Sequence, residues 1–160
     1  MKFKTRDVVV GIIIIAVVVT AGLLYKNLKS PKALPTPSSS GTKEELQEMF
    51  NYQVPDDVDS VELSDVTGGS AKAIATRKYE NGLYTHAVLA DLPDLDSGFY
   101  EGWLVMEDKF ISTGKLRIAK GGYLLEFSSS TDYSFYNKVV ITKELINDQT
   151  PETHILEGSF

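Results

Sequence analysis

The chain has no cysteine and only two histidines, His86 and His154, among its 160 residues. The lack of cysteine excludes disulfides, thiolate metal ligands and cysteine nucleophiles. Two histidines leave little for a zinc or copper site, so we expect neither a metal nor a cofactor. The sequence also lacks a G-x-S-x-G stretch and any spacing that indicates a catalytic triad. We therefore predict a protein that is not an enzyme and has no catalytic residues.

Basic residues are scarce in the C-terminal three quarters of the chain. Six of the 16 Lys and Arg residues, but only one of the 22 Asp and Glu residues, lie within the first 42 positions. The remaining 10 basic and 21 acidic residues give residues 43–160 a formal charge of −11. Such a charge repels phosphate backbones. We therefore expect no nucleic-acid partner.

What the chain does have is one long apolar run from Val8 to Leu24, VVVGIIIIAVVVTAGLL, without a single charge. At about 1.5 Å per residue, a helix of this length spans roughly 25 Å, which approaches the hydrocarbon thickness of a bilayer. We therefore predict a cytoplasmic stub over residues 1–7 and one transmembrane helix over residues 8–25, with Tyr25 at the interface. A cleaved signal peptide, with Val19-Thr20-Ala21 before the cut, is the alternative.

A spacer rich in proline and serine, SPKALPTPSSSGT, ends the segment over residues 26–42. Such a composition is typical of an extended stalk that holds a folded domain off a surface. Lysine and arginine flank the apolar run almost equally on both sides, so the stalk decides the orientation rather than the charge count. We expect a single-pass protein of the cell membrane, with a cytoplasmic N-terminus and an extracytoplasmic domain over residues 43–160.

The extracytoplasmic part has the strand and turn pattern of a mainly β fold. Thr42 and Glu45 have the spacing of a capping box, which predicts a short helix over KEELQEMF. The clearest turn signal after it is Asn81-Gly82, which predicts a type I′ hairpin. Strands then recur about every ten residues, as in sandwich folds. We predict an immunoglobulin-like, antiparallel β-sandwich of two sheets.

The single tryptophan, Trp103, lies in an apolar strand over residues 99–106 and is the expected core anchor. The other predicted core residues are apolar positions of both sheets: Ile74, Val88, Leu89, Leu104, Val105, Leu116, Leu125, Phe127, Val139, Ile141 and Leu156. Tyr133 and Tyr136 lie in the turn-rich stretch SSSTDYSFYN, where a loop would expose them. Because tyrosine combines contact area with a polar group, we predict an interaction surface there.

Two aspartate clusters suggest calcium, because that ion prefers oxygen ligands. The clusters are Asp91, Asp94 and Asp96, and Asp56, Asp57 and Asp59. Neither cluster has the central glycine and closing glutamate of an EF-hand loop. We interpret both as solvated loops.

Three phrases in order, HAVLADLPDLDSGFYEGWLV, ISTGKL and VVITKELINDQTPETHILEGSF, carry a family resemblance. Over about residues 71–160 the chain resembles the extracytoplasmic C-terminal domain of the anti-sigma-K factor RskA family. The matching positions are Leu92-Pro93, Tyr100, Trp103-Leu104, Val140, Ile141, Thr142, Glu144, Pro151, Leu156 and Gly158. The resemblance implies a sensory or interaction role, with an envelope or membrane protein as partner.

The chain departs from that family before the apolar run. Members that act as anti-sigma factors carry a helical cytoplasmic domain there, whereas this chain has only MKFKTRD. Seven residues cannot form a fold that buries a sigma-factor surface, so we expect no direct sigma-factor binding. The alternative function is that of a structural envelope protein or adhesin with a β-sandwich head. An uncharacterised enzyme is the third and least favoured possibility.

Overall fold

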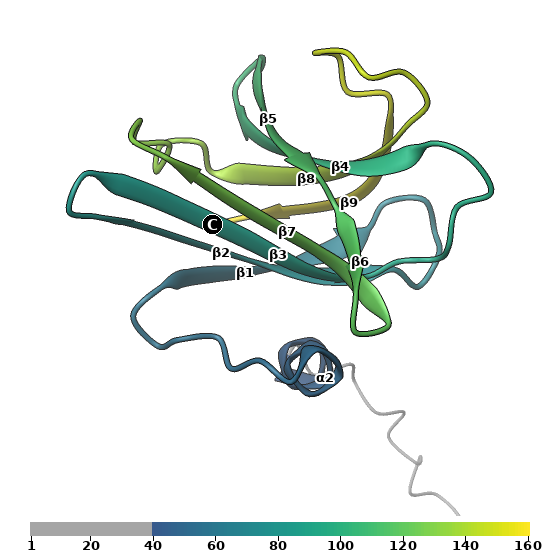
Figure 1. Cartoon of the computed structure of the whole chain (residues 1–160), viewed down its shortest axis with the longest axis horizontal. Helices are drawn as coiled ribbons and strands as arrows, with labels where there is room; N and C mark the ends of the chain where they lie inside the picture. Colours follow the sequence, from purple (N-terminus) through teal and green to yellow (C-terminus); the bar gives the residue numbers. More distant parts are fainter. Residues whose placement is uncertain (1–39) are drawn as a thin grey trace, which may run out of the picture. The chain divides into compact units, whose positions relative to one another are not determined.

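The computed structural model describes residues 40–160 (Figure 1). The predicted cytoplasmic stub, the predicted transmembrane helix over residues 8–25 and nearly all of the stalk lie outside these residues. Within residues 40–160, no helix combines the length and the apolar character that a membrane crossing needs.

The one helix of the described region, α2, runs over Ser40–Phe50. It confirms the predicted helix, but it begins earlier, so Thr42 lies inside the helix and is not its N-terminal cap. Glu45 does not reach back to Thr42, because its carboxylate forms an ion pair with Lys72 of the adjoining sheet. The predicted capping box is therefore wrong, because Glu45 forms a tertiary contact instead.

Nine strands follow the helix. They are β1 (Asp59–Asp65), β2 (Lys72–Glu80), β3 (Leu83–Asp91), β4 (Phe99–Met106), β5 (Lys109–Lys115), β6 (Arg117–Ala119), β7 (Gly122–Ser129), β8 (Lys138–Glu144) and β9 (Thr153–Ser159). All neighbouring strands are antiparallel. The prediction of a mainly β, antiparallel fold is confirmed.

The strands form one continuous sheet in the order β5-β4-β8-β9-β1-β2-β3-β7-β6, whereas the sequence predicted two sheets. The link between its halves is short, because β1 and β9 pair only at Ser64 with Glu157 and at Asp65 with Leu156. Strand spacing in a sequence counts strands but does not show which edges pair. This junction could therefore not be foreseen.

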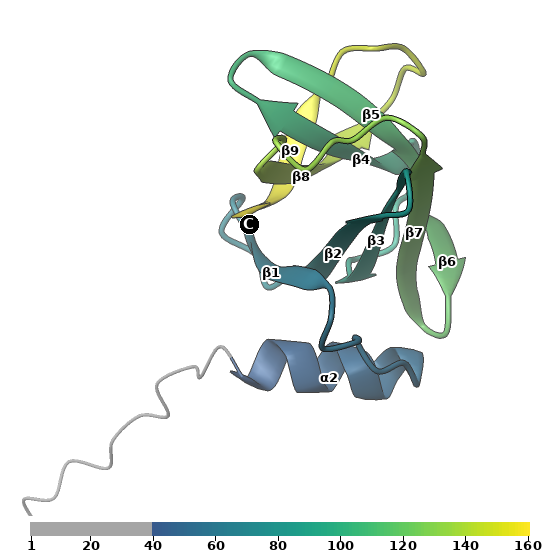
Figure 2. The ribbon, with the colours of Figure 1, turned by 90° about the vertical axis from the view of Figure 1, so that its left-hand side faces the viewer.

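The sheet curls until it is nearly barrel-shaped, and its two halves face each other (Figure 2). The strands at its two ends, β5 and β6, are separated in the chain only by Leu116. The Leu116 amide donates a hydrogen bond of 2.9 Å to the Tyr100 carbonyl, and β5 also contacts β7. The same segment of chain thus brings the two ends of the sheet close together.

The predicted hairpin is present between β2 and β3. Asn81 and Gly82 have φ angles of 52° and 77°, as a type I′ turn requires. Lys120 and Gly121, between β6 and β7, make a similar turn with φ angles of 49° and 86°. This second turn places the β6 edge beside helix α2.

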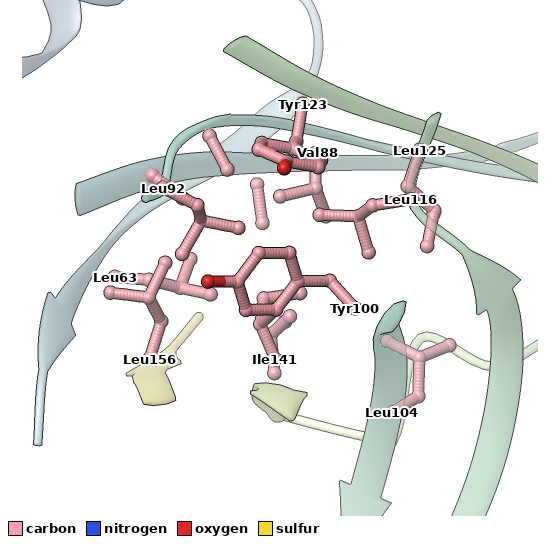
Figure 3. Packing of buried hydrophobic residues seen from close by; sticks show 14 of the residues in the cluster. Leu63, Val88, Leu92, Tyr100, Leu104, Leu116, Tyr123, Leu125, Ile141 and Leu156 are labelled. Atoms are coloured by element: carbon pink, nitrogen blue, oxygen red, sulfur yellow. The ribbon is translucent and has the colours of Figure 1, made fainter. Parts of the chain in front are cut away.

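Buried apolar residues form three clusters rather than one. The largest fills the interior of the curled sheet, with Tyr100 at its centre (Figure 3). A second joins α2 to the outer face of β2 and β3, through Leu46, Phe50 and Ile74 among others. Every predicted core residue is buried except Phe127, which is partly buried.

Trp103 is 1% exposed and belongs to the third cluster, with Val105 and Val140. Its neighbour Leu104 lies in the interior cluster, because successive side chains of a strand point to opposite faces. The indole N–H of Trp103 donates a hydrogen bond of 2.8 Å to the Thr142 hydroxyl of β8. Trp103 therefore anchors the outer face of β4 and β8, not the interior.

Candidate functional site

A groove of about 440 Å³ runs between the end of α2 and the β6–β7 hairpin. Its lining, which we call the helix groove, comprises Phe50, Tyr52, Ala87, Leu89, Arg117, Ile118, Ala119, Lys120, Leu124 and Glu126. Ala87, Leu89 and Leu124 come from β3 and β7. Tyr52 is 44% exposed and Ile118 is 73% exposed. The helix groove thus combines an apolar lining with two exposed apolar side chains.

The end of α2 sets the position of Tyr52. Asn51 has a φ of 44°, and the Tyr52 amide donates to the Gln47 carbonyl at 2.9 Å. The Asn51 amide also donates to the Glu48 carbonyl at 3.0 Å, which completes a Schellman motif. This turn directs the chain away from the helix axis at Tyr52.

Contacts between α2 and the β6–β7 hairpin hold the groove open. The Lys120 ammonium donates a hydrogen bond of 2.5 Å to the Phe50 carbonyl. A Cβ atom on Gly122 would lie 2.7 Å from the Ala90 carbonyl oxygen and 2.8 Å from the Phe50 ring. Glycine is therefore needed here, because helix and sheet approach too closely for a larger residue. The groove exists before any partner binds.

A second groove, of about 330 Å³, adjoins the first and shares Tyr52, Ala87 and Glu126 with it. The segment between α2 and β1 contributes Pro55 and Val58 to its wall. At the rim of the helix groove, Arg117 and Glu126 form an exposed ion pair of 2.6 Å. Together the two grooves follow the outer face of β3 and β7. Sequence reasoning missed them, because their lining comes from four separate segments.

The predicted interaction residues, Tyr133 and Tyr136, are half-buried and pack against the interior cluster. The ring centroid of Tyr133 lies 5.6 Å from that of Tyr84 and 5.5 Å from that of Tyr136, both edge-on. Phe135, between the two tyrosines, is 73% exposed. Both tyrosines are therefore turned inward, and Phe135 is the freely exposed aromatic side chain of this loop.

Arg77 of β2 stabilises the position of that loop. Its guanidinium donates hydrogen bonds of 2.8 Å to the Ser134 carbonyl and of 3.2 Å to the Tyr136 carbonyl. It also pairs with the Asp59 carboxylate at 3.2 Å and lies 4.1 Å from the centroid of the Phe160 ring. No sequence signal singled out Arg77, because its partners lie up to 83 positions away along the chain.

The two histidines lie on β3 and β9, which are not neighbours in the sheet. His86 is 2% exposed, and burial lowers the pKa of its imidazole to about 4. Its Nδ1 lies 2.8 Å from the Thr76 carbonyl oxygen, whereas Nε2 has no hydrogen-bond partner within residues 40–160. His154 is half-buried, with Nδ1 2.6 Å from the Glu157 carboxylate.

Some members of both aspartate clusters form contacts within the protein. Asp94 accepts a hydrogen bond of 3.3 Å from the Tyr123 hydroxyl. A hydrogen bond of 2.7 Å from Lys78 lowers the pKa of Asp57. In the described part of the chain, no three His, Cys, Asp or Glu side chains are grouped as metal ligands.

A third groove, of about 460 Å³, lies where the β1–β2 loop meets the segment after β3. Its carboxylate Asp65 accepts hydrogen bonds from the Thr67 hydroxyl at 2.6 Å, the Thr67 amide at 2.7 Å and the Ala71 amide at 3.1 Å. The bond from the Thr67 hydroxyl is the main reason that the pKa of Asp65 falls to about 2. This carboxylate fastens its own loop, so it is not free for a ligand.

Comparisons of the chain with protein-family models, with curated proteins and with solved structures found no match. The resemblance to the anti-sigma-K factor RskA family therefore stays a prediction. The site is defined by its geometry alone, as an apolar groove between a helix and a hairpin.

Proposed function

We propose that this protein is a membrane-anchored, extracytoplasmic interaction or sensory module that acts through a protein partner in the envelope or membrane. The observation that carries this proposal is the helix groove, with Tyr52 and Ile118 exposed beside apolar side chains. Exposed apolar surface within a polar rim is typical of protein-binding sites. Arg117, Lys120 and Glu126 supply that rim.

The apolar run over residues 8–25 and the stalk after it support the anchor and the extracytoplasmic location. Protease added to intact cells should then remove residues 43–160. Complete protection of these residues in cells with an intact membrane would contradict the proposed orientation.

The facing halves of the curled sheet support a sandwich-like layering, with β4, β5, β8 and β9 packed against β1, β2, β3 and β7. Together with the resemblance to the RskA ectodomain, this layering favours an immunoglobulin-like module with a regulatory role.

A photo-crosslinking amino acid placed at Ile118 of the full-length protein tests the groove in native membranes. Val66 provides a matched control, because it is an apolar residue that is 50% exposed and does not line the groove. We expect one discrete crosslinked protein from position 118, none from position 66, and weaker crosslinking when Tyr52→Ser is added. Identical products from both positions, or none from position 118, would contradict the proposal.

The abundance of the protein separates this function from its alternative. A regulatory module should be scarce and form a stoichiometric crosslink with one membrane protein. A structural envelope protein or adhesin should instead be present in many copies, without a discrete partner.

A further inference from the structure

Residues 130–137, which join β7 to β8 and which we call the tyrosine loop, lie against the interior cluster. Tyr133 packs against Tyr84 of β3 and Phe127 of β7, with ring centroids 5.6 Å and 6.0 Å away. Tyr136 packs on Tyr133 and also belongs to the margin of the interior cluster. The loop contains no strand, and it is held by these aromatic contacts, by Arg77 and, at its end, by a hydrogen bond of 2.9 Å from the Phe160 amide to the Asn137 carbonyl.

His86 lies next to the strand residues that the tyrosine loop contacts. In the register of the sheet it is directly opposite Arg77 of β2 on one side and Phe127 of β7 on the other. Tyr84, which Tyr133 covers, is two residues away on the same strand and the same face. Both the Tyr84 hydroxyl and His86 Nε2 are buried without a hydrogen-bond partner in the described region. The tyrosine loop therefore packs on the aromatic residues that adjoin a buried, neutral imidazole.

The charged groups around His86 offer no compensation for a second positive charge. From β2 it faces Arg77, which is already a cation, and from β3 and β7 it faces Tyr84 and Phe127. The tyrosine loop contributes Asp132, whose carboxylate accepts a hydrogen bond of 2.8 Å from the Ser134 amide. Asp59 of β1 is engaged by Arg77. Neither carboxylate is hydrogen-bonded to His86, and the Arg77 charge disfavours its protonation.

We propose that His86 is a proton sensor, whose protonation releases the tyrosine loop and exposes Tyr133 and Tyr136. A charged imidazole gains solvation when the loop moves away, and it also gains distance from Arg77 if that residue follows the loop carbonyls. The tyrosine loop contributes no residue to the helix groove, so its release can be tested whether or not a partner binds there. His86 and Arg77 also line the adjoining second groove.

The pKa of His86 sets the pH window. The imidazole has a pKa of about 4 when covered, against 6.5 for a solvated histidine, so the released state binds the proton more tightly. The packed state of the tyrosine loop has its full stability above pH 6.5, and it becomes less stable relative to the released state as the pH falls toward 4. The equilibrium constant for release should rise as the pH falls through this range, by up to roughly tenfold per pH unit.

Asp132 acts in a separate range. Hydrogen bonds from Ser134 lower the pKa of Asp132 below its ordinary value of 3.8. Its stabilising effect on the loop is present above pH 3.8 and is lost only below it. Release between pH 6.5 and 4.5 can thus be attributed to histidine.

The absence of cysteine allows a direct test in the full-length protein in lipid nanodiscs. A nitroxide attached at Phe135→Cys, an exposed position of the tyrosine loop, reports its mobility by electron paramagnetic resonance. We expect a slow component at pH 7.5 and a growing fast component down to pH 4.5. His86→Gln keeps a hydrogen-bonding side chain but cannot titrate, so it should stay in the slow state. His154→Gln, which removes the other histidine, should behave like the unaltered protein.

Three outcomes would overturn the proposal. They are an unchanged spectrum at pH 4.5, an equal response in His86→Gln, and loss of the response in His154→Gln alone. Fluorescence of Trp103, which belongs to the third cluster and not to the interior cluster against which the loop packs, separates loop release from unfolding. A shift of its emission in step with the label would mean that the whole domain unfolds, which also contradicts a local sensor. If His86→Gln fails to fold, His86→Phe replaces it under the same criteria.

Discussion

At the scale of single residues, Trp103 depends on one buried hydrogen bond between β4 and β8. Its indole N–H donates to the Thr142 hydroxyl at 2.8 Å, and both residues are at most 1% exposed. Removing the acceptor would lower the free energy of unfolding, because no water can reach the buried indole N–H and replace the lost hydrogen bond. The hydroxyl of Thr142 therefore contributes to the stability of this contact, in addition to the packing of the indole.

Trp103→Phe should lower the free energy of unfolding by roughly 2 kcal/mol, through lost packing and the lost hydrogen bond. Urea unfolding followed by circular dichroism measures this change. A cycle with Thr142→Val separates the two effects, and we expect a coupling of about 1 kcal/mol. A coupling near zero would mean that the hydrogen bond contributes nothing.

Asp65 stabilises the β1–β2 loop in a way that depends on pH. Because its pKa falls from 3.8 to about 2 in the folded state, the charged form stabilises the fold above pH 3.8. This contribution is lost as the pH falls toward 2. Asp65→Asn should lower the melting temperature at pH 7, and the difference from the unaltered protein should shrink between pH 3.8 and 2. Asp96→Asn, an exposed control, should change little. A difference that is constant down to pH 2 would contradict this role.

At the scale of elements, α2 is held by its fit to the sheet more than by its own sequence. Its predicted capping box is not formed, and an ion pair with Lys72 uses Glu45 instead. The helix packs through Leu46 and Phe50, and Gly122 lets β7 approach it. Amphipathic packing of this kind supplies most of the stability of a short helix.

Gly122→Ala should destabilise the domain by about 1–3 kcal/mol, because the new methyl group would overlap the Ala90 carbonyl and the Phe50 ring. Amide hydrogen exchange should accelerate first in α2. Gly41→Ala provides the control, since a Cβ there meets no atom within 4 Å. Because Gly41 lies in helix α2, Gly41→Ala should stabilise the protein by up to about 1 kcal/mol. Equal effects of both changes would show that helix propensity, and not the close approach, decides the outcome.

At the scale of the whole molecule, the two halves of the sheet interdigitate across the interior. A Cβ on Gly102 of β4 would lie 2.6 Å from a methyl group of Leu125 on β7 and 2.7 Å from the Thr113 hydroxyl. These strands are far apart in the order of the sheet, so only its curling brings them into contact. A substitution of Gly102 therefore tests whether the two halves of the sheet pack against each other.

Gly102→Ala should cost about 1–3 kcal/mol and Leu125→Ala about 2–5 kcal/mol, the first by overpacking and the second by leaving a cavity. The double variant should be less destabilised than the sum, because the added methyl group occupies space that the leucine leaves. Chemical unfolding of all four proteins measures the cycle. Simple additivity would mean that the two halves do not contact each other at this point.

Local signals were readable from the sequence where a feature depends on a few adjacent residues. Asn81-Gly82 predicted its hairpin, because its turn needs two residues that tolerate positive φ. Eleven of the twelve residues predicted for the core are buried, but other buried residues, such as Leu63 and Tyr84, were not predicted. Alternation along the strands did not predict that Trp103 and Leu104 serve different clusters, since strand pairing decides which face becomes the interior.

The candidate sites were less predictable. Tyr133 and Tyr136 were expected to be exposed, because a loop has no periodicity that shows which side chains turn inward. Arg77 and His86, which lie beneath them, come from strands more than 40 positions earlier in the chain. The helix groove was missed for the same reason.

The sequence alone determined the mainly β class, the hairpin at Asn81-Gly82, the hydrophobic content of the core and the negative charge of residues 43–160. These properties follow from composition, local backbone preference and alternation. The tertiary structure alone decided that the strands form one curled sheet, that a groove opens between α2 and the β6–β7 hairpin, and that the tyrosine loop packs on Tyr84 and Phe127 beside His86. Each of these depends on contacts between distant segments, whose energies no local pattern of residues encodes.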